Sequence, residues 1–372
     1  MTEPLPFVDL AAQQARIKPE LDRRIAMVLA HGRYILGPEV AELESRLAEF
    51  AGCAHAVTVA SGTDALQIAL MSEGIGPGDA VFLPAFTFTA TAEVPVVLGA
   101  SPVFVDVDPR TFNIDADDLQ RRLDQVRRAG VLRPRAVIAV DLFGLPADYA
   151  ALRDIAARDD LFLIADAAQS FGAQQGGARV GGLAPVTAVS FFPSKPLGCY
   201  GDGGALLTDD ADRASLFRSI RHHGAGGGKY DILRVGLNSR LDTIQAAVLL
   251  AKLDIFEDEL AARETVAQRY DARLGNRLTV PARPDGARGA WAQYSVLSES
   301  RDALRSGLKA AGVPSAVYYP RPLHRQPAYE RYADGACPVS EALCGQILSL
   351  PMNPYLSEAD VGRICDAIDA AV

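Results

Sequence analysis

Lys195 stands between Pro193 and Pro196, directly after an apolar run and before four glycines, in the stretch "SFFPSKPLGCYGDGGA". The prolines restrict the turn around the amine, and the glycines let the backbone approach a ligand closely. A lysine in a partly desolvated pocket loses part of its preference for the charged form, and its neutral amine can attack a carbonyl carbon to form a Schiff base. The pattern favours a nucleophilic lysine, the alternative being a solvated surface lysine.

Asp166 ends the apolar run "LFLIAD". A carboxylate at the end of a buried strand can pair with a buried cation, such as a protonated pyridine nitrogen. Gln169, three residues later, would face the same side of a helical turn. The alternative is that Asp166 only caps a helix that begins at "AAQS".

The segment Ser61-Gly62-Thr63 joins the apolar strand "HAVTVA" to a helix. Free backbone N–H groups and a hydroxyl at a helix N-terminus form a phosphate cradle, although an ordinary N-cap by Ser61 gives the same pattern. Taken together, a phosphate cradle, a strand-end carboxylate and a strand-end lysine are the parts that hold pyridoxal 5′-phosphate. Phe88, after the strand "DAVFLP", is an aromatic side chain able to stack on its ring.

The elements that must position these side chains alternate along residues 55–210. Short apolar runs, which predict buried strands, are separated by helical segments, and two further helices are expected within the first 52 residues. Apolar strands that alternate with helices predict an α/β fold with a mostly parallel sheet covered by helices, whose ligands bind at the carboxyl ends of the strands.

A second unit is expected after residue 246. The segment 240–274 has the spacing of one long amphipathic helix that bridges to the remaining chain. Beyond it we expect a strand at 290–298, a helix at 301–312, a strand at 314–319 and closing helices. The prediction is a large cofactor-binding domain at 1–246 and a smaller α+β domain at 247–372.

Composition narrows the class of protein. The chain is 49% hydrophobic and carries a net charge of −9, which argues against general nucleic-acid binding but allows a local basic pocket. No run of about 18 apolar residues and no basic, apolar leader occur, so we expect a cytoplasmic protein without a membrane partner. The five scattered cysteines lack a CxxC pair, which predicts free thiols and no metal site.

Several long motifs, in the same order, resemble the DegT/DnrJ/EryC1/StrS family of nucleotide-sugar aminotransferases. They are "PFVDLAAQQ", "YILGPEVAELE", "SGTDAL", "ADAAQSFGA", "SFFPSKPLGCYGDGGA", "GLNSRLDTIQAA" and "YYPRPLHRQPAY". The resemblance implies fold type I of the pyridoxal-phosphate enzymes, with pyridoxamine 5′-phosphate formed in the half-reaction. It also implies a homodimer with shared active sites, L-glutamate as the amino donor and a nucleotide-linked ketosugar as the acceptor.

The same resemblance assigns roles by matching position. It implies that the phosphate is held by Gly62, Thr63 and Ser190, and that Lys195 forms the Schiff base. Phe88 would stack on the ring, and Asp166 and Gln169 would contact its polar edge. Asn238 and Arg240 would reach the partner's site, and the substrate would be contacted by Arg240, Tyr319 and His324.

Within the family, "VDLAAQQARI" and "HGRYILGPEV" resemble most the members that aminate C3 of UDP-2-acetamido-2-deoxy-3-oxo-glucuronate for bacterial surface polysaccharide, such as lipopolysaccharide O-antigen. An acceptor of another kind, a dTDP- or UDP-linked 4-keto or other 3-keto hexose, is the alternative. A related dehydratase of the family lacks the Schiff-base lysine, so the presence of Lys195 argues against dehydratase activity. A non-catalytic regulatory homologue would have lost part of the cofactor set, which is complete here.

Overall fold

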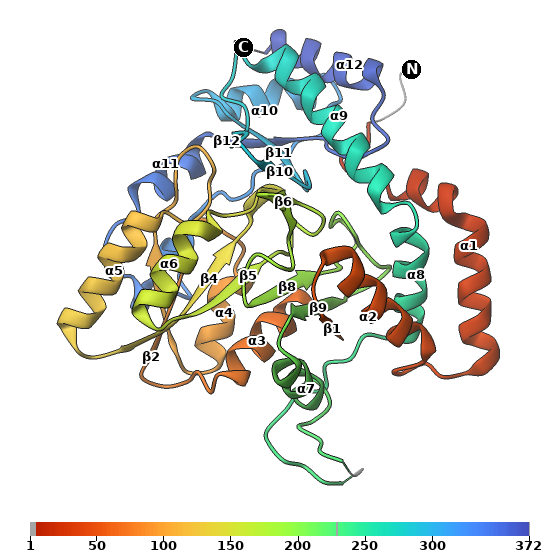
Figure 1. The fold of residues 1–372 in the computed structure, drawn as a ribbon. Coiled ribbons are helices and arrows are strands. Elements are labelled where there is room, and N and C mark those ends of the chain that lie inside the picture. The colour runs from red at the N-terminus through yellow and green to blue at the C-terminus, as the bar shows by residue number, and fades with distance from the viewer. Residues whose placement is uncertain (1–4, 228–229, 372) are drawn as a thin grey trace.

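The computed structural model describes residues 5–227 and 230–371 (Figure 1); Lys229, one of the chain's five lysines, lies outside them. The two helices expected at the N-terminus are confirmed as α1 (Leu10–His31) and α2 (Pro38–Ala51). Helix α2 ends at Gly52, whose φ of 70° lies in the left-handed region that glycine adopts without strain.

A seven-stranded sheet forms the centre of the molecule, in the order β1-β9-β8-β5-β4-β2-β3. Strands β3, β2, β4, β5 and β8 run parallel to one another, whereas β9 is antiparallel to both β8 and β1. The mostly parallel sheet predicted from the sequence is confirmed. Its strands are β1 (His55–Val59), β2 (Asp79–Pro84), β3 (Ser101–Val105), β4 (Arg133–Val140), β5 (Phe162–Asp166), β8 (Val186–Ser190) and β9 (Gly204–Thr208).

Helices cover both faces of this sheet (Figure 1). Successive side chains of β2 enter two different cores, because strand side chains alternate between faces: Phe82 joins one cluster, Val81 and Leu83 the other. The helices between and after these strands are α3 (Gly62–Ser72), α4 (Ala90–Val97), α5 (Ala116–Ala129), α6 (Tyr149–Asp159), α7 (Ala211–Ile220) and a 3-10 turn η1 (Leu142–Gly144).

The expected single helix at 240–274 is wrong, because it is broken into α8 (Thr243–Leu253) and α9 (Phe256–Leu274). Ile255 lies between them with ψ near 2°, outside helical geometry. The side chains of α8 from Ala246 to Leu253 are buried, whereas α9 has one buried face. The two halves therefore pack against different surroundings, which a continuous straight helix could not do.

A smaller unit follows, built on the antiparallel pair β11 (Tyr294–Leu297) and β12 (Ile347–Leu350). The strand expected at 314–319 is wrong: only Ala316 makes an isolated bridge, to Ser349. The remaining elements are β6 (Gln174–Gln175), β7 (Ala178–Arg179), β10 (Ala287–Arg288), α10 (Arg301–Ala310), η2 (Leu323–Arg325), η3 (Glu330–Tyr332), α11 (Pro338–Gln346) and α12 (Glu358–Asp369).

The core of the smaller unit takes side chains from α9 onward and also Leu5 from the N-terminus. Residue 246 lies inside α8, and within α9 the buried Phe256 and Leu260 still belong to a core of the large sheet, whereas Val266 and later residues of α9 belong to the core of the smaller unit. We propose that the boundary between the two units lies within α9 rather than at 246/247.

Three further observations concern the described residues. All five cysteines are free thiols, as predicted. No group of His, Cys, Asp and Glu side chains there could hold a metal ion. Within the same ranges, none of the helices has both the length and the apolar character needed to cross a membrane.

Candidate active site

A cavity of about 470 Å³ opens at the carboxyl ends of the parallel strands β4, β5 and β8. Parallel strands end at the same edge of a sheet, so residues far apart in sequence meet there. The smaller unit closes the other side of the cavity with Gln293, Tyr318 and Tyr319. Of the residues singled out from the sequence, those that line this cavity are Gly62, Thr63, Phe88, Asp166, Gln169, Ser190, Lys195 and Tyr319.

Asp166 ends β5 and is only 7% exposed. Its carboxylate accepts two long hydrogen bonds, from the Thr91 hydroxyl at 3.3 Å and from the Ala168 N–H at 3.2 Å. Burial raises the pKa of this carboxyl group, and these bonds together with the charge of Lys195 only partly oppose the effect. The alternative in which Asp166 caps a helix is wrong, because the residues after it form turns.

Lys195 lies in the turn that follows β8, where its backbone N–H donates to the Phe192 carbonyl at 2.9 Å. Its ammonium group makes no hydrogen bond with any described residue. Burial lowers the pKa of Lys195, while the nearby charge of Asp166 raises it. The amine is therefore easier to deprotonate than a surface lysine, which is the condition for nucleophilic work.

The structure shows Ser61 as the N-cap of α3, whereas its part in a phosphate cradle stays a prediction. Its hydroxyl accepts from the Asp64 N–H at 3.0 Å, so it caps α3. Gly62 lies against Ser190, where an added Cβ would stand 2.7 Å from the serine Cβ. The N-terminus of α3 and the end of β8 are thus pressed together, and Gly62, Thr63 and Ser190 form one polar wall of the cavity.

The glycines after Lys195 are in close contact with neighbouring parts of the chain. A Cβ on Gly204 would stand 2.4 Å from the Ser61 carbonyl oxygen, and one on Gly198 would stand 2.6 Å from the Phe192 oxygen. A Cβ on Gly203 would stand 2.8 Å from Leu241. The glycines therefore let the lysine turn pack closely against its own chain. Gly203 also lines the cavity, and the expected approach of this backbone to a ligand stays a prediction.

Gln169, Tyr319 and Phe88 form the far side of the cavity. The Gln169 side-chain oxygen accepts from the Phe143 N–H at 2.7 Å, and its amide nitrogen donates to the Tyr319 hydroxyl at 3.4 Å. Burial raises the pKa of Tyr319. Phe88 is 56% exposed, and its ring lies 6.4 Å from that of Tyr319 at 40°, which leaves an aromatic surface at the mouth.

Three of the expected residues do not line this cavity in their own chain. Asn238 is exposed, and its side-chain oxygen accepts from Arg240 at 2.5 Å. Arg240 also contacts a ring nitrogen of His222 at 3.3 Å. His324 is buried in η2, where its Nε2 lies 2.9 Å from Glu341 and its Nδ1 has no partner.

Among the lining residues that sequence reasoning missed, two bear on the chemistry of the cavity. Thr91 lies in the first turn of α4, and its hydroxyl donates to Asp166; no local pattern in the sequence marked it. Gln293 enters from the smaller unit, and its side-chain oxygen is buried without a partner. No local pattern pointed to Gln293, because its place depends on how β11 docks against the sheet.

The residues present fit the cofactor expected from the sequence. The polar wall of Gly62, Thr63 and Ser190 suits an anion, and Asp166 has acceptor capacity that its two long bonds leave unused. A buried carboxyl group with a raised pKa becomes charged when a cation sits beside it. Lys195 supplies an amine within the same cavity. Pyridoxal 5′-phosphate needs these three groups together.

The sequence profile of the DegT/DnrJ/EryC1/StrS aminotransferase family matches residues 15–369. The UDP-2-acetamido-2-deoxy-3-oxo-D-glucuronate aminotransferase of Pseudomonas aeruginosa is 49% identical over 365 residues, 97% of this chain and 99% of that protein.

Solved structures agree with this family. An aminotransferase of the family from Brucella abortus is 54% identical, with a TM-score of 0.97 over 98% of this chain and 99% of that chain. NtdA from Bacillus subtilis, solved with bound cofactor PMP, is 26% identical, with a TM-score of 0.90 over 100% of this chain and 86% of that chain. The strand-end lysine and carboxylate thus lie in an aminotransferase fold, and the chain belongs to the DegT/DnrJ/EryC1/StrS aminotransferase family.

Proposed function

We propose that this aminotransferase uses pyridoxal 5′-phosphate to move an amino group from L-glutamate to C3 of UDP-2-acetamido-2-deoxy-3-oxo-glucuronate. The observation that carries the proposal is the pairing of Asp166 with Lys195 in one cavity beside the polar wall at Gly62 and Ser190. The acceptor follows from the 49% identity to the Pseudomonas aeruginosa enzyme over nearly the whole of both chains.

Each residue of the cavity has a distinct task in this proposal. The bound cofactor supplies a carbonyl carbon that accepts the amino group and a ring that takes up negative charge. Gly62, Thr63 and Ser190 bind its phosphate, and Asp166 keeps a proton on its ring nitrogen. Lys195 holds the carbonyl carbon and then moves a proton to and from the reacting carbon.

We propose that Gln169 fixes the polar edge of the ring while Phe88 covers its face. The Gln169 side chain is held at both ends, by Phe143 and Tyr319, so its orientation is set before any ligand enters. The exposed ring of Phe88 at the mouth is placed to stack on a flat group and to exclude water from it.

The active sites are proposed to be shared within a homodimer. Asn238 and Arg240 do not line their own chain's cavity, and they follow a segment whose Ile232, Leu233 and Val235 are exposed, the last by 84%. Exposed apolar side chains gathered in one segment mark an interaction surface. A second copy of the chain would cover them and receive Asn238 and Arg240 beside its cofactor. Tyr319, which lines the cavity, is a further proposed substrate contact. His324 was expected to contact the substrate as well but is buried next to Glu341, outside the cavity.

A cytoplasmic location remains a prediction from the sequence pattern, and a part in bacterial surface polysaccharide synthesis, O-antigen included, remains a prediction from the resemblance. The alternative acceptor, a dTDP- or UDP-linked 4-keto or other 3-keto hexose, would use the same cofactor site. Only the sugar-binding contacts would differ.

The test is a direct comparison of acceptors by the purified protein. Glutamate should first bleach the visible band of the cofactor-loaded enzyme, and the 3-keto uronic acid should then restore it with release of an amino sugar. Faster turnover of a dTDP-4-keto-6-deoxysugar would overturn the acceptor while leaving the family intact. A colourless protein without turnover of either acceptor would instead favour a regulatory homologue.

A further inference from the structure

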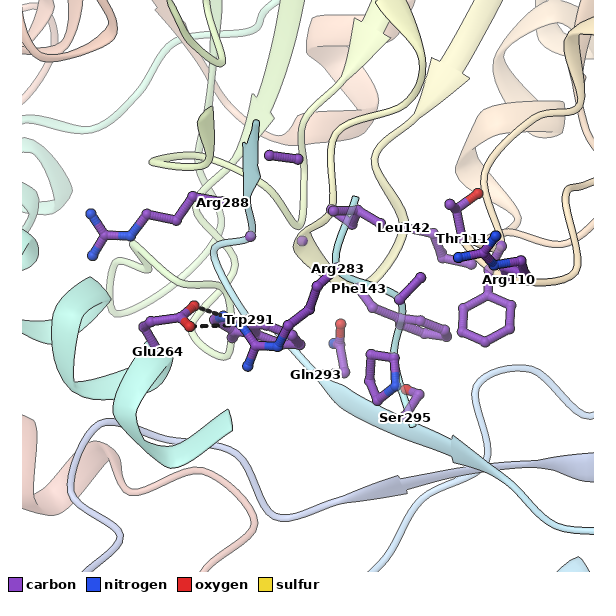
Figure 2. Close-up of a pocket in the computed structure, with 17 residues that line it drawn as sticks. Arg110, Thr111, Leu142, Phe143, Glu264, Arg283, Arg288, Trp291, Gln293 and Ser295 are labelled. Atoms are coloured by element: carbon purple, nitrogen blue, oxygen red, sulfur yellow. Dashed lines mark hydrogen bonds and ion pairs between the residues drawn. The ribbon is translucent and has the colours of Figure 1, made fainter. Parts of the chain in front are cut away.

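A second pocket, of about 270 Å³ (Figure 2), shares the lining residue Gln293 with the lysine cavity. It is formed where the loops 110–112 and 142–145 of the large sheet meet the segment 281–295 of the smaller unit. Its volume is just below that of pockets for drug-sized ligands, which suits a small metabolite. None of the tasks proposed above uses this pocket.

Three residues that line this second pocket have unusual backbone dihedral angles. Phe112, Phe143 and Trp291 all line it, and all three have positive φ, at 65°, 59° and 51°. They are half of the six non-glycine residues with positive φ in the described ranges. Bulky side chains rarely adopt this conformation, and such strain gathers at sites that clamp ligands.

The charge of the pocket is positive. Glu264 is the only carboxylate among its described lining residues, and it is already bonded to Arg283 at 2.7 Å and to the Trp291 ring N–H at 2.6 Å. Arg110 is exposed, and its guanidinium has no ion-pair partner among the described residues; in Figure 2 it lies on the side of the pocket away from Glu264 and Arg288. Arg288 stands at the outer edge and points away from Arg110 (Figure 2).

Gln293 lines both this pocket and the lysine cavity. Its side-chain oxygen is buried and accepts no hydrogen bond from the described residues. A buried amide oxygen without a donor is costly, and a ligand that carries N–H groups would satisfy it. The pocket therefore offers a free cation at one wall and a free acceptor on the side that faces the lysine.

The wall between the two cavities is thin. Gly144 has a φ of 101°, and an added Cβ there would stand 2.8 Å from the Trp291 nitrogen and 3.0 Å from the Gln169 carbonyl oxygen. Phe143 donates its backbone N–H to the Gln169 side chain. A ligand in the second pocket would thus touch the same loop that orients Gln169.

We propose that this pocket recognises the amino donor as an acidic amino acid, with Arg110 binding its distal carboxylate and Gln293 accepting from its ammonium group. This inference rests on the proposed function, since it concerns the donor half of the same reaction. Its physical basis is complementarity: a free guanidinium pairs with a carboxylate, and the free amide oxygen receives the ammonium at the edge of the lysine cavity. Arg110 then makes the enzyme prefer glutamate to an amino acid with an apolar side chain.

The test measures binding separately from turnover. Glutarate has both carboxylates of glutamate but no amino group, so calorimetry with it reports carboxylate recognition alone. Arg110→Ala should weaken glutarate binding about tenfold, as expected for loss of a charge-assisted hydrogen bond. Arg110→Lys should be intermediate. Arg305→Ala removes an exposed arginine of α10 that lines neither cavity and is the matched control; it should bind glutarate as the wild type does.

The Gln293→Leu variant distinguishes recognition of the ammonium group from recognition of the distal carboxylate. It should lower kcat/KM for glutamate but leave glutarate binding unchanged, because only glutamate carries the ammonium group. Equal glutarate affinity in Arg110→Ala and wild type overturns the inference, even when glutamate is transaminated normally. The opposite result is also informative. If glutarate binding depends on Arg110 but the protein does not transaminate, carboxylate recognition is supported and the proposed function is contradicted.

Discussion

At the level of single residues, Lys195 and Asp166 influence each other's protonation. Burial lowers the pKa of Lys195 and raises that of Asp166, and the attraction between their opposite charges opposes both shifts. Lys195→Ala removes the only lysine that lines the cavity within the described residues, so turnover should be lost. Borohydride reduction of the loaded wild type, followed by peptide mapping, should place the cofactor on the peptide that contains Lys195. A label on Lys252 instead would contradict the assignment.

Asp166→Asn tests the carboxylate without changing its shape. The amide oxygen can still accept from the Ala168 N–H, and the amide nitrogen can donate to the Thr91 hydroxyl, so the fold and the retention of cofactor should persist. It cannot balance a protonated ring nitrogen, and turnover should fall on the order of 10²-fold or more. Cofactor absorbance and steady-state rates measure the two effects separately. Near wild-type turnover would show that Asp166 serves only the local turn.

At the level of elements, helix α8 supports the turn that contains Lys195 through contacts with Gly198 and Tyr200. Lys252 is fully buried in α8, donates to the Gly198 carbonyl at 2.6 Å, and lies 4.3 Å from the centre of the Tyr200 ring. Gln245, two turns earlier on α8, bonds to the backbone N–H and carbonyl of Tyr200 at 2.8 Å and 3.2 Å. The position of Lys195 therefore depends on a helix that contributes nothing to the cavity itself.

Lys252→Met should loosen this support and leave a buried carbonyl unsatisfied, at a cost of about 1–3 kcal/mol. The effect should depend on pH. Burial lowers the pKa of Lys252 from 10.5 to about 8, despite the opposing charges of Glu259 and Cys199. Between these values the unfolded chain binds the additional proton, so the free energy of unfolding of the wild type rises with pH.

The stability advantage of the wild type over Lys252→Met should therefore grow from about pH 8 to about pH 10. Melting temperatures of both proteins across this range measure it, with exposed Lys309→Met as the control for a lysine lost elsewhere. A difference in melting temperature that stays constant over the range would mean that Lys252 keeps its proton throughout.

At the level of the whole molecule, the proposed dimer joins Lys195 of one chain to Arg240 of the other. Two inactive variants, Lys195→Ala and Arg240→Ala, should then complement each other when their subunits exchange. A mixed dimer has one site with both defects and one with neither, so random pairing should restore about a quarter of wild-type activity. If Arg240 serves its own chain, every site keeps a defect, and no activity should return despite proven exchange.

The sequence by itself determined the central sheet and most of the cavity. Asp166 and Ser190 end apolar runs that could only be buried strands, and Lys195 follows one of them. Because parallel strands end at one edge of a sheet, the order of these runs along the chain was enough to predict that the three residues converge. The glycine at the end of α2 was equally readable, since it reflects local backbone geometry.

Only the tertiary structure decided what depends on contacts between distant segments. The residues 314–319 have a strand-like composition, yet β12 is the segment that pairs with β11. The break between α8 and α9 follows from their different surroundings rather than from a helix-breaking residue. Gln293 reaches both cavities because the smaller unit docks on the sheet at that point. Local sequence encodes propensity and burial, whereas these positions are fixed by packing energies summed across the fold.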